Sequence, residues 1–282
     1  MAFKRILLPI NGQDDIDLVA DYAFKLAAMN SAEVEVLHPY PRFYDVITSV
    51  SESGSANQIA QEIQSVRDRY QDENRKAAEH FARLSSKYTG TTTRFVEREG
   101  HTSEILTRRA FSSDLTVVGS AERYDSAFWR NVYDGALVHS ARPVFVVPTR
   151  AGSPPATDQL AQNVLIAWKG STELVRALEG AKPFLASAVN VRLIAVGERD
   201  RIDRTVEQMK DYLSLHSSDV TAKAVEAVDG HIAKTILAEA KQMEHCLLVM
   251  GAYSHARWRE RFFGGVTEYV LHNGDVPILM AH

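Results

Sequence analysis

The stretch Lys4-Arg5-Ile6-Leu7-Leu8-Pro9-Ile10-Asn11-Gly12 decides the fold of this chain, because the chain contains it twice. It returns 158 residues later as Gln162-Asn163-Val164-Leu165-Ile166-Ala167-Trp168-Lys169-Gly170. Each copy is a short apolar run that ends in a polar residue and a glycine. Such a run predicts a strand that is buried on both of its faces.

A second pair of matching stretches lies late in each half. Asp114–Ser120 matches His245–Ala252, and each is followed by a helical stretch, a turn, a proline and a last apolar strand, Pro143–Val147 or Pro277–Ala281. A repeat of this length indicates two copies of one α/β domain. Differences between the copies are then informative about function, because a ligand site kept in one copy can decay in the other.

Length and composition are those of an ordinary globular protein. The chain has 282 residues, of which 45% are hydrophobic and 24% charged, which suits two domains of about 140 residues each. A net charge of −4 gives no global reason to expect nucleic acid or an anionic membrane as a partner. The lone Cys246 lies in an apolar run and is expected to be a small buried residue. Met1–Arg5 leads straight into a strand, so we expect a cytoplasmic protein.

Alternating short apolar runs and amphipathic stretches predict the order of elements in each half. In the first half the strands are expected at Arg5–Ile10, Glu33–His38, Thr92–Glu97, Leu115–Gly119 and Val144–Pro148, and the helices at Asp15–Met29, Gln58–Lys87 and Thr102–Phe111. In the second half the strands are expected at Val164–Trp168, Val191–Val196, Thr221–Val225, Cys246–Gly251 and Pro277–Ala281, and the helices at Thr172–Leu185, Asp203–Leu215, Ile232–Lys241 and Val266–His272.

Strict alternation of strand and helix predicts the fold class. We expect α/β architecture with two tandem doubly wound parallel sheets, one in residues 1–148 and one in residues 163–282. The first copy carries about 28 additional residues before its third strand, including a loop at Pro39–Asn57. Thr149–Gln162, with Gly152-Ser153-Pro154-Pro155, is the expected linker.

The candidate binding site follows from this fold, because ligands bind beyond the carboxyl ends of parallel strands at the topological switch point. After the fourth strand, the second copy reads Gly251-Ala252-Tyr253-Ser254 and then, after nine intervening residues, Gly264-Gly265-Val266-Thr267. Glycines that open a helix let the backbone approach a phosphate, and the free N–H groups of the first turn are suited to bind an anion. Tandem glycines are also ordinary turn residues, and no Walker A or G-x-G-x-x-G motif accompanies them.

At these residues, over the whole chain, the sequence resembles the universal stress protein family in its tandem form. Nucleotide-binding members carry G-x2-G-x9-G-[ST] after the fourth strand, and Gly251-x2-Ser254-x9-Gly264-Gly265 has the same spacing. The resemblance implies an adenine-nucleotide-hydrolase-like, Rossmann-type fold and ATP or a related adenine nucleotide, with or without magnesium, as the ligand. The nucleotide-binding residues that it implies are Ala167, Trp168, Lys169, Val196, Met250, Gly251, Tyr253, Ser254, Gly264, Gly265, Val266 and Thr267.

This chain departs from the family pattern at two of those positions. Lys169 stands where the family usually has Asp after the first strand, which replaces a carboxylate by a cation and removes the basis for a metal role at that position. Gly265 stands in place of Ser or Thr, which removes a side-chain hydroxyl but keeps the backbone donor. Trp168 has two open interpretations, since its ring either stacks on the adenine or fills the crevice.

The first copy departs further from the motif. Aligned on Pro143 and Pro277, Arg130-Asn131 takes the place of Gly264-Gly265, and we expect its side chains to crowd the approach. The sequence therefore predicts a degenerate first half and a nucleotide site in the second half. Pro9, Ile10 and Asn11 keep a family-like first loop, which leaves a different small ligand open for the first half.

Three functional classes remain on the sequence alone. The favoured one is a cytoplasmic stress-response protein that binds ATP or a related nucleotide, with no catalytic residues and at most slow hydrolysis. The second is a nucleotide-free interaction module. The third is an adenylating enzyme of the same superfamily, which is disfavoured because Lys169-Gly170-Ser171-Thr172 stands where an S-G-G-x-D loop is required.

The last strands of the two halves provide a prediction about assembly. In the family the last strands of two domains pair across a pseudo-twofold axis, so Val144–Val147 and Ile278–Ala281 are expected to pair within this chain as an internal pseudo-dimer. A homodimer of the whole chain and an unidentified protein partner are further expectations of the resemblance.

Overall fold

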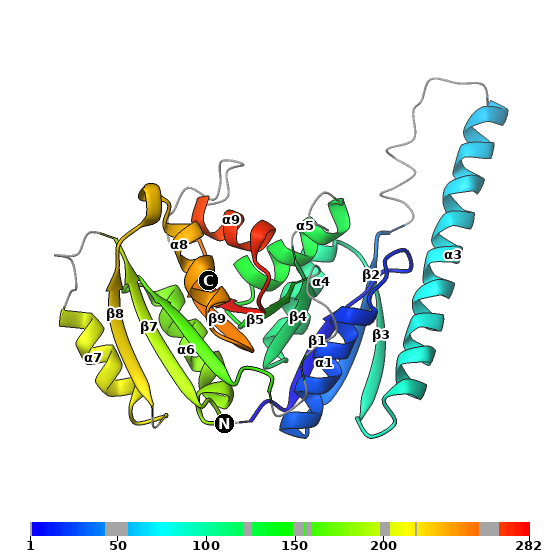
Figure 1. Ribbon diagram of the computed structural model, residues 1–282. Helices are drawn as coiled ribbons and strands as arrows, with labels where there is room; N and C mark the ends of the chain where they lie inside the picture. Colours follow the sequence, from blue (N-terminus) through cyan, green and yellow to red (C-terminus); the bar gives the residue numbers. More distant parts are fainter. Residues whose placement is uncertain are drawn as a thin grey trace.

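A computed structural model describes residues 2–42, 56–120, 126–148, 155, 159–197, 204–217, 219–253 and 265–282. Over these residues the strands form one ten-stranded sheet with helices on both faces (Figure 1). The sheet order is β3-β2-β1-β4-β5-β10-β9-β6-β7-β8, so strands 1–5 form one half of the sheet and strands 6–10 the other.

The elements follow the predicted order in both halves. The first half contains β1 (Arg5–Pro9), α1 (Asp17–Asn30), β2 (Glu33–Tyr40), α3 (Ala56–Lys87), β3 (Thr93–Glu99), α4 (Thr102–Phe111), β4 (Leu115–Gly119), α5 (Ala127–Tyr133), a π-helical turn (Asp134–Val138) and β5 (Val144–Val147). The second half contains β6 (Asn163–Trp168), α6 (Thr172–Leu185), β7 (Asn190–Val196), α7 (Arg204–Leu213), β8 (Val220–Val225), a short 3-10 turn (Val228–Gly230), α8 (Ile232–Lys241), β9 (Cys246–Gly251), α9 (Gly265–Asn273) and β10 (Ile278–Ala281).

The two halves join through their last strands, as predicted. All strand pairs within a half are parallel, whereas β5 and β10 are antiparallel, with Val146 opposite Ile278 and Val144 opposite Met280. Each last strand thereby covers the edge that the other would otherwise expose. The prediction of two doubly wound sheets packed as an internal pseudo-dimer is confirmed.

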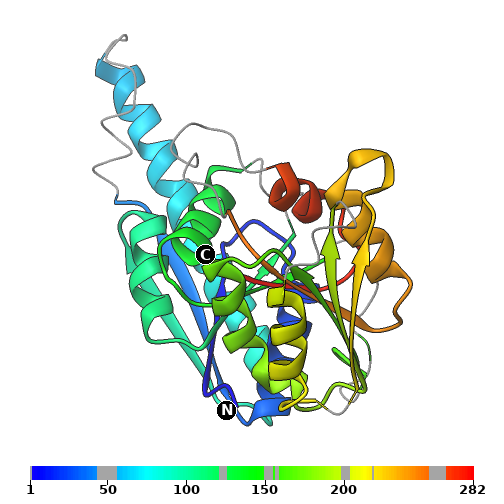
Figure 2. The ribbon, with the colours of Figure 1, turned by 90° about the vertical axis from the view of Figure 1, so that its left-hand side faces the viewer.

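Helices cover both faces of this common sheet (Figures 1 and 2). Side chains from α1, α3, α6 and α7 pack on one face, and those from α4, α5, α8 and α9 pack on the other. Aromatic residues connect the halves on the first face, where the ring of Phe184 lies 5.8 Å from that of Phe3 and 6.1 Å from that of Phe145. The apolar core is therefore continuous across the seam between the halves.

The first half differs from the prediction at the end of its second strand. β2 continues to Tyr40, so Pro39 belongs to the strand and not to the expected loop. Proline is tolerated there because β1 pairs with β2 only as far as Leu37, while β3 continues alongside to Tyr40. α3 then extends well beyond the end of the sheet in both views (Figures 1 and 2). Residues 43–55 of the predicted loop, and most of the predicted linker, lie outside the described residues.

Candidate functional site

A cavity of about 230 Å³ lies at the topological switch point of the second half. β6 stands between β9 and β7, and the helices that follow β6 and β9, α6 and α9, pack on opposite faces of the sheet. This divergence opens a crevice at the carboxyl ends of the two strands. The cavity is lined by Ala167, Trp168, Lys169, Ser171, Leu174, Ile194, Val196, Ile232, Ile236, Met250, Gly251, Val266 and Thr267.

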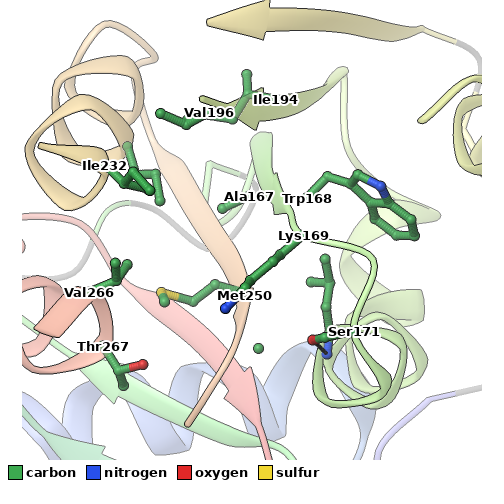
Figure 3. A pocket seen from close by; sticks show the side chains of 13 residues that line it. Ala167, Trp168, Lys169, Ser171, Ile194, Val196, Ile232, Met250, Val266 and Thr267 are labelled. Atoms are coloured by element: carbon green, nitrogen blue, oxygen red, sulfur yellow. Dashed lines mark hydrogen bonds between the residues drawn. The ribbon is translucent and has the colours of Figure 1, made fainter. Parts of the chain in front are cut away.

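The walls of the cavity are mostly apolar. β7 contributes Ile194 and Val196 from one side, and α8 contributes Ile232 and Ile236 from the facing helix. In Figure 3, the labelled side chains of Ile194, Val196, Ile232 and Met250 surround one common space. Walls of this kind favour a flat or compact apolar group, and a few polar side chains then fix the orientation of that group.

Lys169 supplies the one cationic side chain among the lining residues of the described part of the chain. It follows β6, is exposed, and in Figure 3 extends its amino group toward Met250 and Thr267. Among the described residues, no carboxylate lines the cavity. An anionic group in the cavity would therefore meet the amino group of Lys169.

Thr267 lies on the first turns of α9 and is tied to the loop after β9. Its hydroxyl accepts a hydrogen bond from the backbone N–H of Tyr253 at 3.4 Å, and both residues are buried. Tyr253 has a left-handed backbone, with φ of 55°, and its ring lies 6.4 Å from that of His282. The start of α9 is thus anchored to the end of β9 at the cavity.

Gly251 ends β9 where the sheet meets the start of α6. A Cβ on Gly251 would lie 2.7 Å from the backbone nitrogen of Leu174 and 3.1 Å from Cβ of Glu173, so only glycine allows this approach. Partial burial acts to raise the pKa of Glu173, but hydrogen bonds from its own backbone, from Ser171 and from Thr172, together with nearby His282, lower the pKa below its ordinary value. The carboxylate therefore stays ionised at the N-terminus of α6.

Trp168 fulfils neither of its two predicted roles. Because side chains alternate along β6, Ala167 faces the cavity, whereas the indole of Trp168 packs with the core on the α6 and α7 side. Its Nε1 donates a hydrogen bond to Oγ1 of Thr205 at 3.3 Å, and Figure 3 shows the ring directed away from the cavity. The ring is held where it neither stacks in the cavity nor fills it.

Most of the residues implied by the sequence come together here. Those that line the cavity are Ala167, Trp168, Lys169, Val196, Met250, Gly251, Val266 and Thr267. Tyr253 reaches it through its hydrogen bond to Thr267, and Gly265 begins α9 without lining the cavity. Ser254 and Gly264 lie outside the described residues.

Sequence reasoning missed five lining residues: Ser171, Leu174, Ile194, Ile232 and Ile236. Two signals were available for three of them. Ile194 precedes Val196 by two positions on one strand, and Ile232 and Ile236 are one helical turn apart on a predicted helix. Assigning them to the site also required knowing that α8 stands opposite β7.

The equivalent crevice of the first half is filled by side chains from α5. Trp129 and Tyr133 are each 1% exposed. The indole Nε1 of Trp129 donates to Oδ2 of Asp14 at 2.6 Å, and the hydroxyl of Tyr133 donates to the carbonyl of Gly119 at the end of β4. These contacts join the loop after β1 and the end of β4 to one helix.

Asn11, the counterpart of Lys169, belongs to the same closed network. Its Nδ2 donates to Oδ2 of Asp14 at 2.7 Å, while its Oδ1 accepts from the backbone N–H groups of Gln13 and Asp14 at 3.1 and 2.9 Å. Arg130 and Asn131, which the sequence places at this approach, have exposed side chains. Their neighbours one and two positions away on the buried face of α5 occupy the space.

No group of three or more His, Cys, Asp or Glu side chains in the described ranges is placed to hold a metal ion. No helix among the described residues is long and apolar enough to cross a membrane.

Comparison with known proteins gives consistent matches over the whole chain. The profile of the universal stress protein family matches residues 2–148 and 161–282. A universal stress protein of Synechocystis sp. (strain PCC 6803) is 22% identical over 98% of this chain and 99% of its own length. Among solved structures, a universal stress protein from Archaeoglobus fulgidus has a TM-score of 0.70 at 17% identity, covering 98% of this chain and 95% of its own. A universal stress protein described as putative, from Pseudomonas aeruginosa, has a TM-score of 0.56 at 12% identity, covering 99% and 92%.

Proposed function

The chain belongs to the universal stress protein family, with both of its halves matched, and we propose that it binds ATP or a related adenine nucleotide in its second half. In this proposal it acts in the cytoplasm as a regulatory or protective binding protein of the stress response. Any hydrolysis of the nucleotide is slow and incidental. The proposal also assigns residues 1–148 to a degenerate domain and residues 163–282 to the binding domain.

The observation that carries the proposal is the cavity at the carboxyl ends of β6 and β9. Its apolar part, formed by Ile194, Val196 and Ile236, suits the flat faces of an adenine ring. Its polar part combines Lys169 and Thr267 with the N-terminus of α9, and the backbone N–H groups of a first helical turn favour a phosphate. A base and a phosphate therefore each meet suitable groups within one site.

The proposed ligand does not depend on a metal held by the protein. Within the described ranges no lining residue is a carboxylate, so in this proposal a magnesium ion enters with the nucleotide and not ahead of it. Lys169 supplies a point charge of the kind that stabilises phosphate oxygens. Ser254 and Gly264 complete the proposed binding set by the sequence motif alone.

Direct detection of the nucleotide tests the proposal. Acid extraction of the purified protein followed by mass spectrometry of the supernatant is expected to release an adenine nucleotide, and calorimetry of the emptied protein is expected to show ATP binding. Ala167→Phe should abolish that binding, because the new ring enters the cavity from β6. Ala186→Phe, on an exposed residue after α6, is the matched control and should bind as the wild type does.

Each alternative function has its own outcome in this experiment. Absence of any extracted nucleotide, together with no heat of binding for ATP, would favour the nucleotide-free interaction module. The cavity volume of about 230 Å³ gives this alternative some support, since small-molecule sites commonly measure about 300–1,000 Å³. Release of pyrophosphate from ATP would instead indicate the adenylating enzyme.

A further inference from the structure

A carboxylate with two cations lies under the helix α4 in the first half. Glu35, in the middle of β2, is completely buried. Arg109 of α4 binds it through two atoms, with Nε 2.6 Å from Oε1 and Nη2 2.5 Å from Oε2, and Arg94 of β3 also contacts Oε2. Here the sheet provides the carboxylate and the helix provides a cation.

The second half has a similar cluster under α8, with the opposite arrangement of charge. Glu239 of α8 is 8% exposed, and its Oε2 lies 2.7 Å from Nζ of Lys223 on β8 and 3.5 Å from Nη1 of Arg192 on β7. In this half the helix provides the carboxylate and the sheet provides both cations.

The reversal concerns equivalent positions in the fold. Glu35 lies opposite Leu7, and Arg192 lies opposite Leu165, the residues that match in the repeated first strand. α4 and α8 each have ten residues and begin directly after His101 and His231, so Arg109 and Glu239 are both the eighth residue of their helix. One sheet–helix pair therefore carries Glu–Arg in the first half and Arg–Glu in the second.

We propose that this reversed pair of ion clusters specifies which helix, α4 or α8, packs on the first strand–helix–strand unit of each half, here called the opening unit. Each half begins with a strand–helix–strand unit, β1-α1-β2 or β6-α6-β7, on which α4 or α8 later packs. The repeat makes the two opening units alike in shape and in apolar pattern, so exchange between halves or between molecules is the expected assembly error. Charge is what distinguishes the units at this contact.

Exchange of the opening units would bring like charges together in a buried place. Glu35 and Glu239 would share Lys223 as the one cation of their cluster, and Arg192, Arg109 and Arg94 would meet without the carboxylate of either cluster. A buried charge without an opposite partner is strongly destabilising, whereas a matched pair is tolerated. The clusters therefore disfavour the exchanged assembly more than they stabilise the correct one.

Charge reversal within one half tests the complementarity. Arg109→Glu, or Glu35→Arg alone, is expected to lower the melting midpoint by about 10 °C or to prevent soluble expression. The double variant Glu35→Arg/Arg109→Glu keeps Arg94, so its helix provides the carboxylate and its sheet both cations, as in the second half. Its melting midpoint should recover at least half of the decrease seen in the single variants. Arg75→Glu, in an exposed ion pair with Glu79, is the control and should change the midpoint by about 1 °C or less.

A helix graft tests the specificity itself. Replacing the ten residues of α4 by those of α8 places Glu at position 109, and this graft should fold poorly with Glu35 and well with Glu35→Arg. Equal melting midpoints for the two grafts would overturn the proposal. The proposal would also be overturned if the double variant had the same melting midpoint as the single variants, or if it failed to express as they do.

Discussion

The crevices at the switch points of the two halves have the same framework and opposite contents. In the second half, β6 and β9 end at an apolar cavity into which Lys169 extends. In the first half, the ends of β1 and β4 are closed by Trp129 and Tyr133. The comparison shows that strand order creates the position of a site, while a few side chains on the following helix decide whether the site is open.

The loop after the first strand takes part in this difference. Asn11 and Asp14 bind each other and the indole of Trp129, so the polar groups of the first loop are used internally. At the same place in the second half, Gly170 has a left-handed backbone with φ of 66°, and Ser171 caps α6 by accepting from Leu174 N–H at 3.3 Å. The two loops thus satisfy their polar groups in different ways, and Lys169 extends over the cavity.

The largest effect is expected from opening the closed crevice. Trp129→Ala removes a buried indole and the donor to Asp14, which should lower the free energy of unfolding by about 3–5 kcal/mol. Chemical denaturation measures this loss. The matched variant is Trp168→Ala in the second half. Because this indole is only half-buried, its removal should lower the free energy of unfolding by less than half as much. Equal losses would contradict the assignment of Trp129 as the residue that closes the first half.

A smaller loss is expected from crowding the open crevice at Gly251. Gly251→Ala places a Cβ within 2.7 Å of the Leu174 backbone and should cost about 1–3 kcal/mol, with weaker nucleotide binding because β9 and α6 move apart. Gly265→Ala is the control for stability alone, since a Cβ there meets no atom of the described residues within 4 Å. Denaturation and calorimetry together check both variants. A Gly251→Ala protein as stable as Gly265→Ala would show that the close approach relaxes without cost.

Exchange of the residue after the first strand tests the role of charge in the proposed binding. Lys169→Asn introduces the residue of the first half and, without magnesium, should weaken nucleotide binding about tenfold, or about 1.4 kcal/mol. Lys169→Asp should weaken it further and gain a dependence on magnesium, whereas wild-type affinity should fall as salt is raised. Titration of the three proteins with and without magnesium measures these effects. Identical affinities under all conditions would show that Lys169 has no part in binding.

The last prediction concerns the seam between the halves, and its effect is present only at high pH. Burial raises the pKa of Tyr22 on α1 to about 12, while the matching position on α6 is Gly180. Since the unfolded phenol ionises near pH 10 and the folded one does not, the stability from the neutral phenol is complete below pH 10 and is lost progressively as pH rises toward 12.

Tyr22→Phe should therefore lose less stability than the wild type between pH 10 and pH 12, as measured by denaturation at several pH values. The pKa of Cys246 is also raised by burial, to about 12, so both proteins retain a common loss above pH 9. Parallel stability curves for the two proteins would show that the phenol of Tyr22 ionises equally in the folded and unfolded states.

The candidate site was predictable from the sequence where it depends on strand ends. Ala167, Val196, Met250 and Gly251 lie at the ends of strands whose apolar patterns are plain, and all four line the cavity. The direction of the Trp168 ring was not predictable, because it depends on which face of β6 α7 and Thr205 pack against. Ile232 and Ile236 were missed for a similar reason, since their helix had to be placed opposite β7.

The sequence by itself determined the tandem architecture and the order of the elements along the chain, and its resemblance to the family predicted the pairing at the seam. The architecture follows from apolar patterns within short stretches and from the repeat of those stretches. Only the tertiary structure decided which side chains close the first crevice and how charge is arranged under α4 and α8. The bond that closes the first crevice joins Asp14 and Trp129, 115 residues apart, and the ion pair under α4 joins Glu35 and Arg109, 74 residues apart. Contacts at such separations arise from packing, because no local pattern records which side chains meet once the sheet has formed.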